Sequence, residues 1–231
     1  MIVIGIVLLA GALSGVPAET PPIFGDTGNV QGRITYSGEV PKPIKLLVIK
    51  DVKVCAKIDH YDDRLVVGSD SGINNVVVSL VGVEGGKSID SLGTEFVLDQ
   101  KFCAYDPHVL IVPVNKQIKI LNSDGILHNI HTYGKQNPSV NLAQPRFKKK
   151  LKLTLDKPEK VQVRCDVHGW MTTYVGVMDH PYFAVTDDAG GFTIPNLPVG
   201  SYTLEAWHEK LGTKSVDVVV SEGMPPLEIK F

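Results

Sequence analysis

The chain of 231 residues has almost no net charge, because 23 Lys and Arg residues stand against 25 Asp and Glu residues. A near-neutral surface provides no field for gripping a phosphate backbone, so nucleic-acid binding is excluded. After residue 18, no apolar run reaches the roughly 20 residues that a membrane-spanning helix needs. The sequence also has neither an HExxH pair nor a nucleophilic Ser or Cys in a Gly-rich elbow. No enzyme motif is therefore recognisable.

Helical periodicity is equally scarce. No stretch keeps its apolar residues at a 3.6-residue period over 11 residues. Instead, short β-branched runs alternate with Gly, Pro, Asn and Asp, as in NNVVVSLVGV, QIKILNSD and GFTIPNLPVGSYTLEAW. The 22 Gly and 15 Pro residues suit a protein with many tight turns. We therefore predict an all-β fold.

The first 18 residues have the composition of a secretory leader. Residues 1–13 are apolar and uncharged but short for a membrane span, and Val16-Pro17-Ala18 places small residues before a cleavage site. We expect cleavage after Ala18 and a periplasmic or secreted protein. Contact with a membrane is expected only if this segment stays uncleaved.

Cysteine is scarce, with three residues in the chain. In an exported protein, an odd cysteine is a free thiol, an intermolecular link or a metal ligand. Cys165 alone lies among metal-ligating residue types. Cys55 and Cys103 are therefore predicted to form a disulfide, with two buried free thiols as the alternative.

The sequence VRCDVHGWM, residues 163–171, places Cys165, His168 and Met171 at spacings of three between two apolar runs. A thiolate, an imidazole and a thioether form a soft ligand set that suits copper. A trigonal site with a weak axial Met needs one more imidazole. His128 in NSDGILHNI is predicted to supply it, because it follows a turn and opens a strand. The alternative is a buried Cys, a surface His and a core Met that lie together by chance.

The segment NSDGILHNI followed by a Cys-x-x-His-x-x-Met loop resembles the plastocyanin- and amicyanin-like cupredoxins, which are small blue copper β-barrels. The resemblance covers roughly residues 99–179. It implies a Greek-key barrel that holds one copper ion, cycling between Cu(I) and Cu(II), through His128, Cys165, His168 and Met171.

The same resemblance assigns roles to the neighbours of the ligands. Asn129 is expected to brace the two ligand loops by hydrogen bonding. His168 is expected to lie near the surface beside Trp170, where the pair forms the port for electrons. His131 follows His128 by three residues and faces the other side of the strand unless a bulge intervenes, so it stays an alternative ligand.

The C-terminal segment TDDAGGFTIPNLPVGSYTLEAWHE resembles the carboxypeptidase regulatory-like domain, a small transthyretin-like β-sandwich, and GNVQGRITYSGEVP resembles its opening strand. The predicted organisation is a signal peptide at 1–18, N-terminal strands at 29–90, a cupredoxin domain at 91–180 and the smaller sandwich at 181–231. In one arrangement, the N-terminal strands pack with the C-terminal sandwich and the barrel is inserted between them. In the other, residues 29–91 add strands to the barrel.

The predicted function is that of an exported type 1 copper protein, not an enzyme, that carries single electrons between a donor and an acceptor, such as a cytochrome or an oxidoreductase. Three alternatives stay open: copper handling, an enzyme with an open site in which His131 or water replaces Met171, and a metal-free binding module. The basic run RFKKKLKLTL, residues 146–155, is either a solvated strand edge or a docking patch for an acidic partner.

Overall fold

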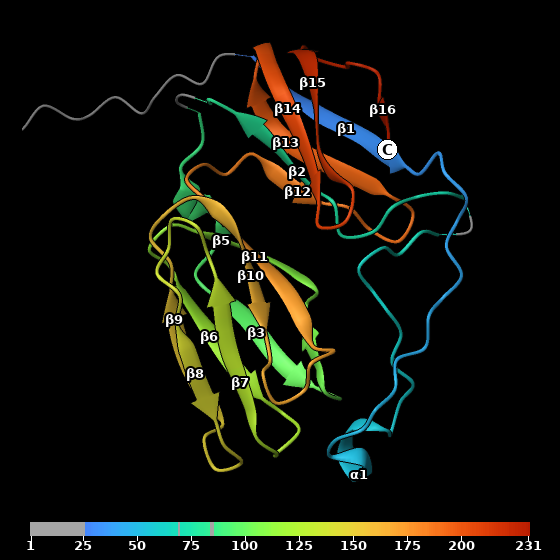
Figure 1. Cartoon of the computed structure of the whole chain (residues 1–231). Coiled ribbons are helices and arrows are strands. Elements are labelled where there is room, and N and C mark those ends of the chain that lie inside the picture. Colours follow the sequence, from blue (N-terminus) through green and yellow to red (C-terminus); the bar gives the residue numbers. More distant parts are fainter. Residues whose placement is uncertain (1–25, 69, 84–85) are drawn as a thin grey trace, which may run out of the picture.

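The computed structural model describes residues 26–68, 70–83 and 86–231, so the predicted signal peptide lies outside the described residues. Within these ranges, the chain is almost entirely strands, which confirms the all-β prediction (Figure 1). The helical elements described are single turns, α1 (Val52–Cys55) and a 3-10 turn (Ile89–Leu92). None of the described helices is long and apolar enough to cross a membrane.

Residues 96–178 form two sheets that share one apolar core, and we call this unit the inserted sandwich. One sheet has the order β5-β11-β10-β7-β8 and the other the order β4-β3-β6-β9. The strands of the first sheet are β5 (Val109–Pro113), β7 (His128–Tyr133), β8 (Asn141–Gln144), β10 (Glu159–Arg164) and β11 (Thr172–Met178). Those of the second are β3 (Phe96–Lys101), β4 (Ala104–Asp106), β6 (Gln117–Asn122) and β9 (Lys150–Thr154).

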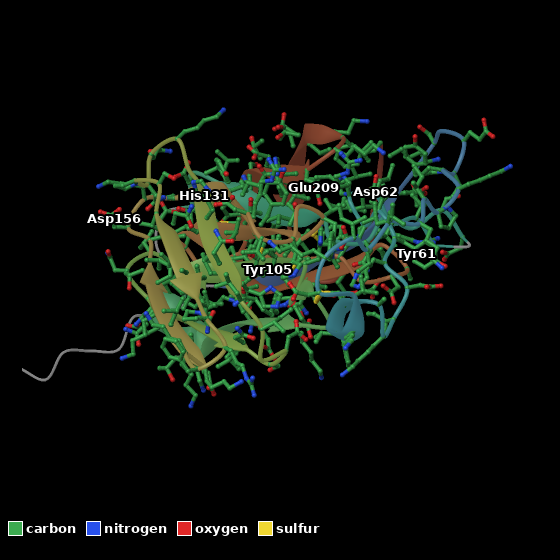
Figure 2. The ribbon with its side chains drawn as sticks, turned by 60° about the horizontal axis from the view of Figure 1, so that its bottom comes forward. Tyr61, Asp62, Tyr105, His131, Asp156 and Glu209 are labelled. Atoms are coloured by element: carbon green, nitrogen blue, oxygen red, sulfur yellow. A yellow bond between two sulfur atoms is a disulfide. The ribbon has the colours of Figure 1, made fainter. Side chains whose placement is uncertain are left out.

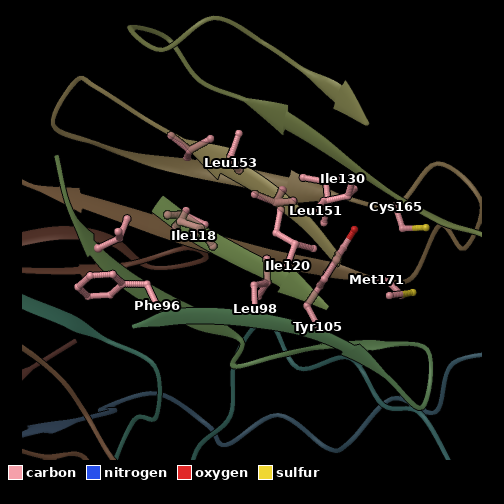
Figure 3. Packing of buried hydrophobic residues seen from close by; sticks show 14 of the residues in the cluster. Phe96, Leu98, Tyr105, Ile118, Ile120, Ile130, Leu151, Leu153, Cys165 and Met171 are labelled. Atoms are coloured by element: carbon pink, nitrogen blue, oxygen red, sulfur yellow. The ribbon is translucent and has the colours of Figure 1, made fainter. Parts of the chain in front are cut away.

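Alternating burial along the strands explains this core. In β9, the sequence KLKLT buries its two Leu residues and exposes its two Lys residues and the Thr. Figure 3 shows the apolar side chains of β3, β6, β7 and β9 meeting between the sheets, with Cys165 and Met171 at one end of the core.

The remaining strands form a second sandwich, which we call the flanking sandwich because it contains strands from both ends of the described chain. Its sheets have the orders β13-β1-β16 and β12-β2-β14-β15. Its strands are β1 (Thr27–Thr35), β2 (Val77–Val81), β12 (Phe183–Val185), β13 (Gly191–Pro198), β14 (Gly200–His208), β15 (Gly212–Val220) and β16 (Leu227–Lys230).

Strand pairing connects the N-terminal strands to the C-terminal part of the chain. β1 pairs with β13 and runs parallel to β16, while β2 lies between β12 and β14. The inserted sandwich therefore follows β2 in sequence and returns to β12, the neighbour of β2. The domain boundaries given above stay a prediction.

The two sandwiches meet at a small apolar cluster of Val77, Val109 and Met178. A charged cluster lies at the same junction. His108, just before β5, pairs with Glu209 after β14, and its Nδ1 lies 3.1 Å from a carboxylate oxygen of Asp63. His108 and Glu209 are nearly buried, with 11% and 7% of their side chains exposed.

Between β1 and β2, the chain leaves the flanking sandwich and runs along the side of the molecule to α1 (Figure 1). We call residues 44–62 of this excursion the strap. Its two legs are joined by hydrogen bonds from the Leu46 amide to the His60 carbonyl and from the Asp62 amide to the Ile44 carbonyl, both 2.8 Å. A disulfide between Cys55 and Cys103 ties the strap to the inserted sandwich, as the sequence predicts.

Candidate metal centre

Three side chains converge at the end of the inserted sandwich. His128 opens β7, Cys165 directly follows β10, and His168 lies in the turn between β10 and β11. The two Nδ1 atoms are 3.1 Å apart, and the Cys165 Sγ lies 4.0 Å from Nδ1 of His128 and 3.8 Å from Nδ1 of His168. Both imidazoles are fully buried and Cys165 is 2% exposed. The structure therefore brings together three of the four predicted ligands as a buried N₂S group.

The size of this triangle fits a metal ion. A triangle with sides of 3.1, 3.8 and 4.0 Å has a point about 2.1 Å from every corner, within the usual range of metal–nitrogen bonds and near that of metal–sulfur bonds. Two nitrogens and one thiolate in a plane are the donor set of a blue-copper site. The residues present therefore fit copper.

Met171, the fourth predicted ligand, lies at the end of the loop that also carries Cys165 and His168. Its amide donates to the His168 carbonyl at 3.0 Å, and its carbonyl accepts from the Cys165 amide at 3.2 Å. The side chain is 2% exposed and belongs to the same core as Cys165, and Figure 3 shows both sulfur-bearing side chains at one end of that core. The thioether therefore lies at the same end of the core as Cys165.

The Asp124 carboxylate is hydrogen-bonded to Nε2 of His128, the ring nitrogen that does not face Cys165. Nε2 donates to the Asp124 carboxylate at 2.9 Å, and this carboxylate also accepts the amides of Phe102 and Cys103 at 2.6 and 2.8 Å. Because a carboxylate only accepts hydrogen bonds, Nε2 carries the proton and Nδ1 presents its lone pair to the site. Asp124 therefore fixes both the tautomer and the orientation of this ring.

The strap holds the outer nitrogen of His168 in the same way. Nε2 of His168 donates to the Asp51 carboxylate at 2.9 Å, and Asp51 precedes α1 with a left-handed backbone (φ 48°). The His168 ring is fully buried, and the Asp51 side chain in contact with its Nε2 is 36% exposed, so the surface is reached through Asp51. Sequence reasoning did not find Asp51, because it lies 117 residues before His168 in a segment with no ligand pattern.

Trp170, the second residue of the expected electron port, packs against the covered ring. The ring centroids of Trp170 and His168 are 5.2 Å apart, and the indole N–H donates to the Cys103 carbonyl at 3.0 Å. Trp170 is half-buried and lines a cavity of about 310 Å³ together with Arg64 and Arg164. Trp170 thus contacts both His168 and the disulfide-bonded Cys103, and it lines a cavity at the surface.

Hydrogen bonds favour the thiolate form of Cys165. Burial acts to raise the pKa of the thiol, but the contacts with the His128 and His168 rings and the hydrogen bonds from the backbone N–H groups of Asn129 and His168 outweigh it and lower the pKa to about 6. The thiolate is the form that binds a metal.

Asn129 connects the two segments that carry the ligands, as expected for a brace. Its side-chain carbonyl accepts the amide of Asp166 at 2.7 Å, and its side-chain amide donates to the Asn141 and Asp166 side chains. Its backbone carbonyl accepts from the buried Tyr105 hydroxyl at 2.7 Å. The spacing between β7 and the Cys165 loop is therefore fixed from both sheets.

His131, the alternative ligand, lies away from the N₂S group. Its Nδ1 lies 3.0 Å from the Asp166 carboxylate and 2.9 Å from the Tyr133 hydroxyl, and a quarter of the side chain is exposed. In Figure 2, His131 lies on the other side of Tyr105 from Tyr61 and Asp62 of the strap. The structure does not bring it to the candidate site.

Comparisons with known proteins give remote matches. Residues 156–225 match the family model described as polysaccharide lyase family 4, domain II, and no curated protein matches the chain. This model does not confirm the carboxypeptidase regulatory-like resemblance, and its residues span the last strands of one sandwich and much of the other.

Solved structures with detectable likeness include a Cu-containing nitrite reductase (NirK) from Thermus scotoductus SA-01, at 18% identity and a TM-score of 0.33. The match covers 43% of this chain and only 25% of that enzyme. A Cu(I) form of an amicyanin variant has 16% identity and a TM-score of 0.34, and the match covers 44% of this chain and 98% of amicyanin. Likeness at this level does not establish a shared family.

Proposed function

We propose that this protein is an exported type 1 copper protein that carries single electrons. One observation supports the proposal above the others: two imidazole Nδ1 atoms and a thiolate form a buried triangle of metal-binding size beside a buried Met171. The disulfide is in keeping with an oxidising compartment, either the periplasm or the medium. Its partners would be a donor and an acceptor redox protein.

A bound copper ion would supply a centre that gains or loses one electron without making or breaking a covalent bond. His128, Cys165, His168 and Met171 would hold it. The protein's own part is to keep these ligands in one arrangement in both oxidation states. Asp124 and Asp51 orient the two imidazoles, and the apolar core excludes water from the site.

Burial of the ligands argues against the alternatives that need an open site. A copper-handling protein has to pass the ion to another ligand set, and an enzyme has to admit a substrate. His128 and His168 are fully buried, and Cys165 and Met171 are each 2% exposed. Neither exchange nor substrate access is therefore favoured by this geometry.

The proposal is tested by adding one equivalent of Cu(II) to the purified protein and recording its visible spectrum before and after ascorbate. We expect an intense thiolate-to-copper band that bleaches on reduction and returns on oxidation. Cys165→Ser should abolish the band, while Met171→Gln should keep it and mainly shift the reduction potential. His131→Gln is the matched control and should retain the spectrum. A colourless wild-type protein would refute the proposal.

A further inference from the structure

The outward face of the strap lies over the His168 end of the metal centre and exposes large apolar side chains. Leu47, Ile49 and Val52 are 80%, 75% and 53% exposed, although they lie within six residues of one another. Val48 and Val54, from the same segment, pack against the core of the inserted sandwich. Single exposed apolar residues are ordinary, but a local group of this kind is typical of an interaction site.

This exposure occurs in a segment that is fastened at several points. Cys55 is bonded to Cys103 by the disulfide, and the Asp51 carboxylate accepts a hydrogen bond from His168. His60 also contacts the carbonyl of Cys55 at 2.9 Å. The apolar side chains are therefore presented in fixed positions. Such pre-ordering lowers the entropic cost of binding a partner.

The charge of the same face is positive. Lys50 and Lys53 are exposed and alternate with the apolar residues. The acidic residue between them, Asp51, is bonded to His168 through one of its carboxylate oxygens. A complementary surface would have an apolar centre and carboxylates at its rim.

The strap also gives a short path from the surface to the centre. His168 itself has no exposed surface, but the Asp51 carboxylate in contact with its Nε2 has 36% of its side chain exposed. A partner seated on Lys50 and Val52 would be separated from a candidate ligand by one side chain.

We propose that residues 47–53 form the docking surface for an acidic one-electron redox protein, with the electron crossing at Asp51 and His168. This inference rests on the proposed function. In each encounter, one electron moves from the reduced member of the pair to the oxidised member, with no atom transferred. The strap, and not an exposed loop that carries a metal ligand, is thus the segment that contacts the partner.

The electrostatic part can be tested on the metal-free protein, independently of copper binding. Hexacyanochromate(III), a redox-inert paramagnetic trianion, should broaden the backbone amide signals of residues 47–53 in NMR spectra. The effect should disappear in the Lys50→Glu/Lys53→Glu variant. Strap signals that stay sharp in the wild type would overturn the proposal, even if the protein binds copper as proposed.

The electron path is tested with the copper-loaded, reduced protein and ferricyanide, which gains one electron to become ferrocyanide. At low ionic strength, Lys50→Glu/Lys53→Glu should slow this oxidation about tenfold, and added salt should remove the difference. The matched control is Lys148→Glu/Lys149→Glu, in the other basic segment, which should stay within about twofold of the wild type. An equal or larger effect of the control pair would overturn the proposal.

An anionic membrane is the other surface that an apolar and basic strap could meet. Sedimentation with vesicles of phosphatidylcholine and phosphatidylglycerol distinguishes the two. We expect the protein to stay in the supernatant. Sedimentation that is lost in Lys50→Glu/Lys53→Glu would assign the strap to a membrane and overturn the proposal of an acidic protein partner.

Discussion

At the scale of single residues, the two candidate imidazole ligands share one feature, since each donates its Nε2–H to a carboxylate. Asp124 lies against His128 and Asp51 against His168, both at 2.9 Å. A carboxylate in this position makes the imidazole a more basic, electron-rich ligand. Two such carboxylates next to one centre stabilise its more positive oxidation state.

Removing either negative charge should therefore raise the reduction potential. We expect Asp51→Asn and Asp124→Asn to keep the hydrogen bond and the blue colour while the potential moves upward, because Cu(II) loses more stabilisation than Cu(I). Potentiometric titration followed at the thiolate band measures this. Asp217→Asn, which neutralises an exposed carboxylate bonded to Thr203, is the control. A potential that falls in the Asp51 and Asp124 variants would contradict this account.

Sequence analysis can identify residues that form a recognisable motif within a short segment. One nine-residue segment predicts Cys165, His168 and Met171 as ligands, and the turn before His128 predicts the fourth. Asp124 lies in the same NSDGILH segment, four residues before His128, and could have been found from that spacing. Asp51 could not, since a lone Asp in a lysine-rich segment has no pattern that points to a histidine far along the chain.

At the scale of elements, the strap depends on the Cys55–Cys103 disulfide for its position. The two cysteines are 48 residues apart, and closing a loop of that length lowers the entropy of the unfolded chain. We expect Cys55→Ser/Cys103→Ser to lower the free energy of unfolding of the metal-free protein by up to about 4 kcal/mol. Denaturation in guanidinium chloride measures the change.

The same variant should expose the covered imidazole. Without the disulfide, the strap keeps only its weaker contacts, so His168 should react faster with diethyl pyrocarbonate than it does in the wild type. Mass spectrometry of the labelled peptides gives the rate for each histidine. His131, which is already a quarter exposed, serves as the internal reference. Equal labelling of His168 in both proteins would show that the strap stays closed without its disulfide.

Strand prediction succeeded where β-branched residues dominate and failed where they do not. QIKILNSD corresponds to β6, and the second half of GFTIPNLPVGSYTLEAW corresponds to β14, and burial alternates along both strands. β8 has the sequence NLAQ, and its status as a strand comes from pairing with β7, not from its composition. The strap was not predicted as a unit because its order comes from tertiary bonds to Cys103 and His168.

At the scale of the whole molecule, His108 joins three separate parts of the chain. It lies directly before β5 in the inserted sandwich, Asp63 follows the strap, and Glu209 lies between β14 and β15. Burial acts to lower the pKa of His108, but the nearby carboxylates of Asp63 and Glu209 outweigh it and raise the pKa to about 9. The ring is therefore charged at neutral pH and bridges two carboxylates.

This cluster should make the junction sensitive to alkaline pH. A histidine whose pKa is raised on folding contributes its full stability below its unfolded pKa, and the contribution is lost as pH rises through the folded value. Between pH 6.5 and pH 9, we expect the free energy of unfolding to fall by an amount on the order of 3 kcal/mol, reduced by the exposure of Asp63. Urea denaturation across this range tests it. His108→Gln should flatten the dependence, and an unchanged slope would assign it to other groups.

The position at which the inserted sandwich joins the flanking sandwich determines where a domain can be exchanged in this molecule. Ser79 of β2 and Phe183 of β12 are register partners in one antiparallel pair, so everything between them occupies the position of a hairpin loop. The entropy cost of a loop grows only slowly with its length. The β2–β12 pair is therefore a site for domain insertion. Another domain whose termini lie close together can replace the inserted sandwich there without breaking a strand pair.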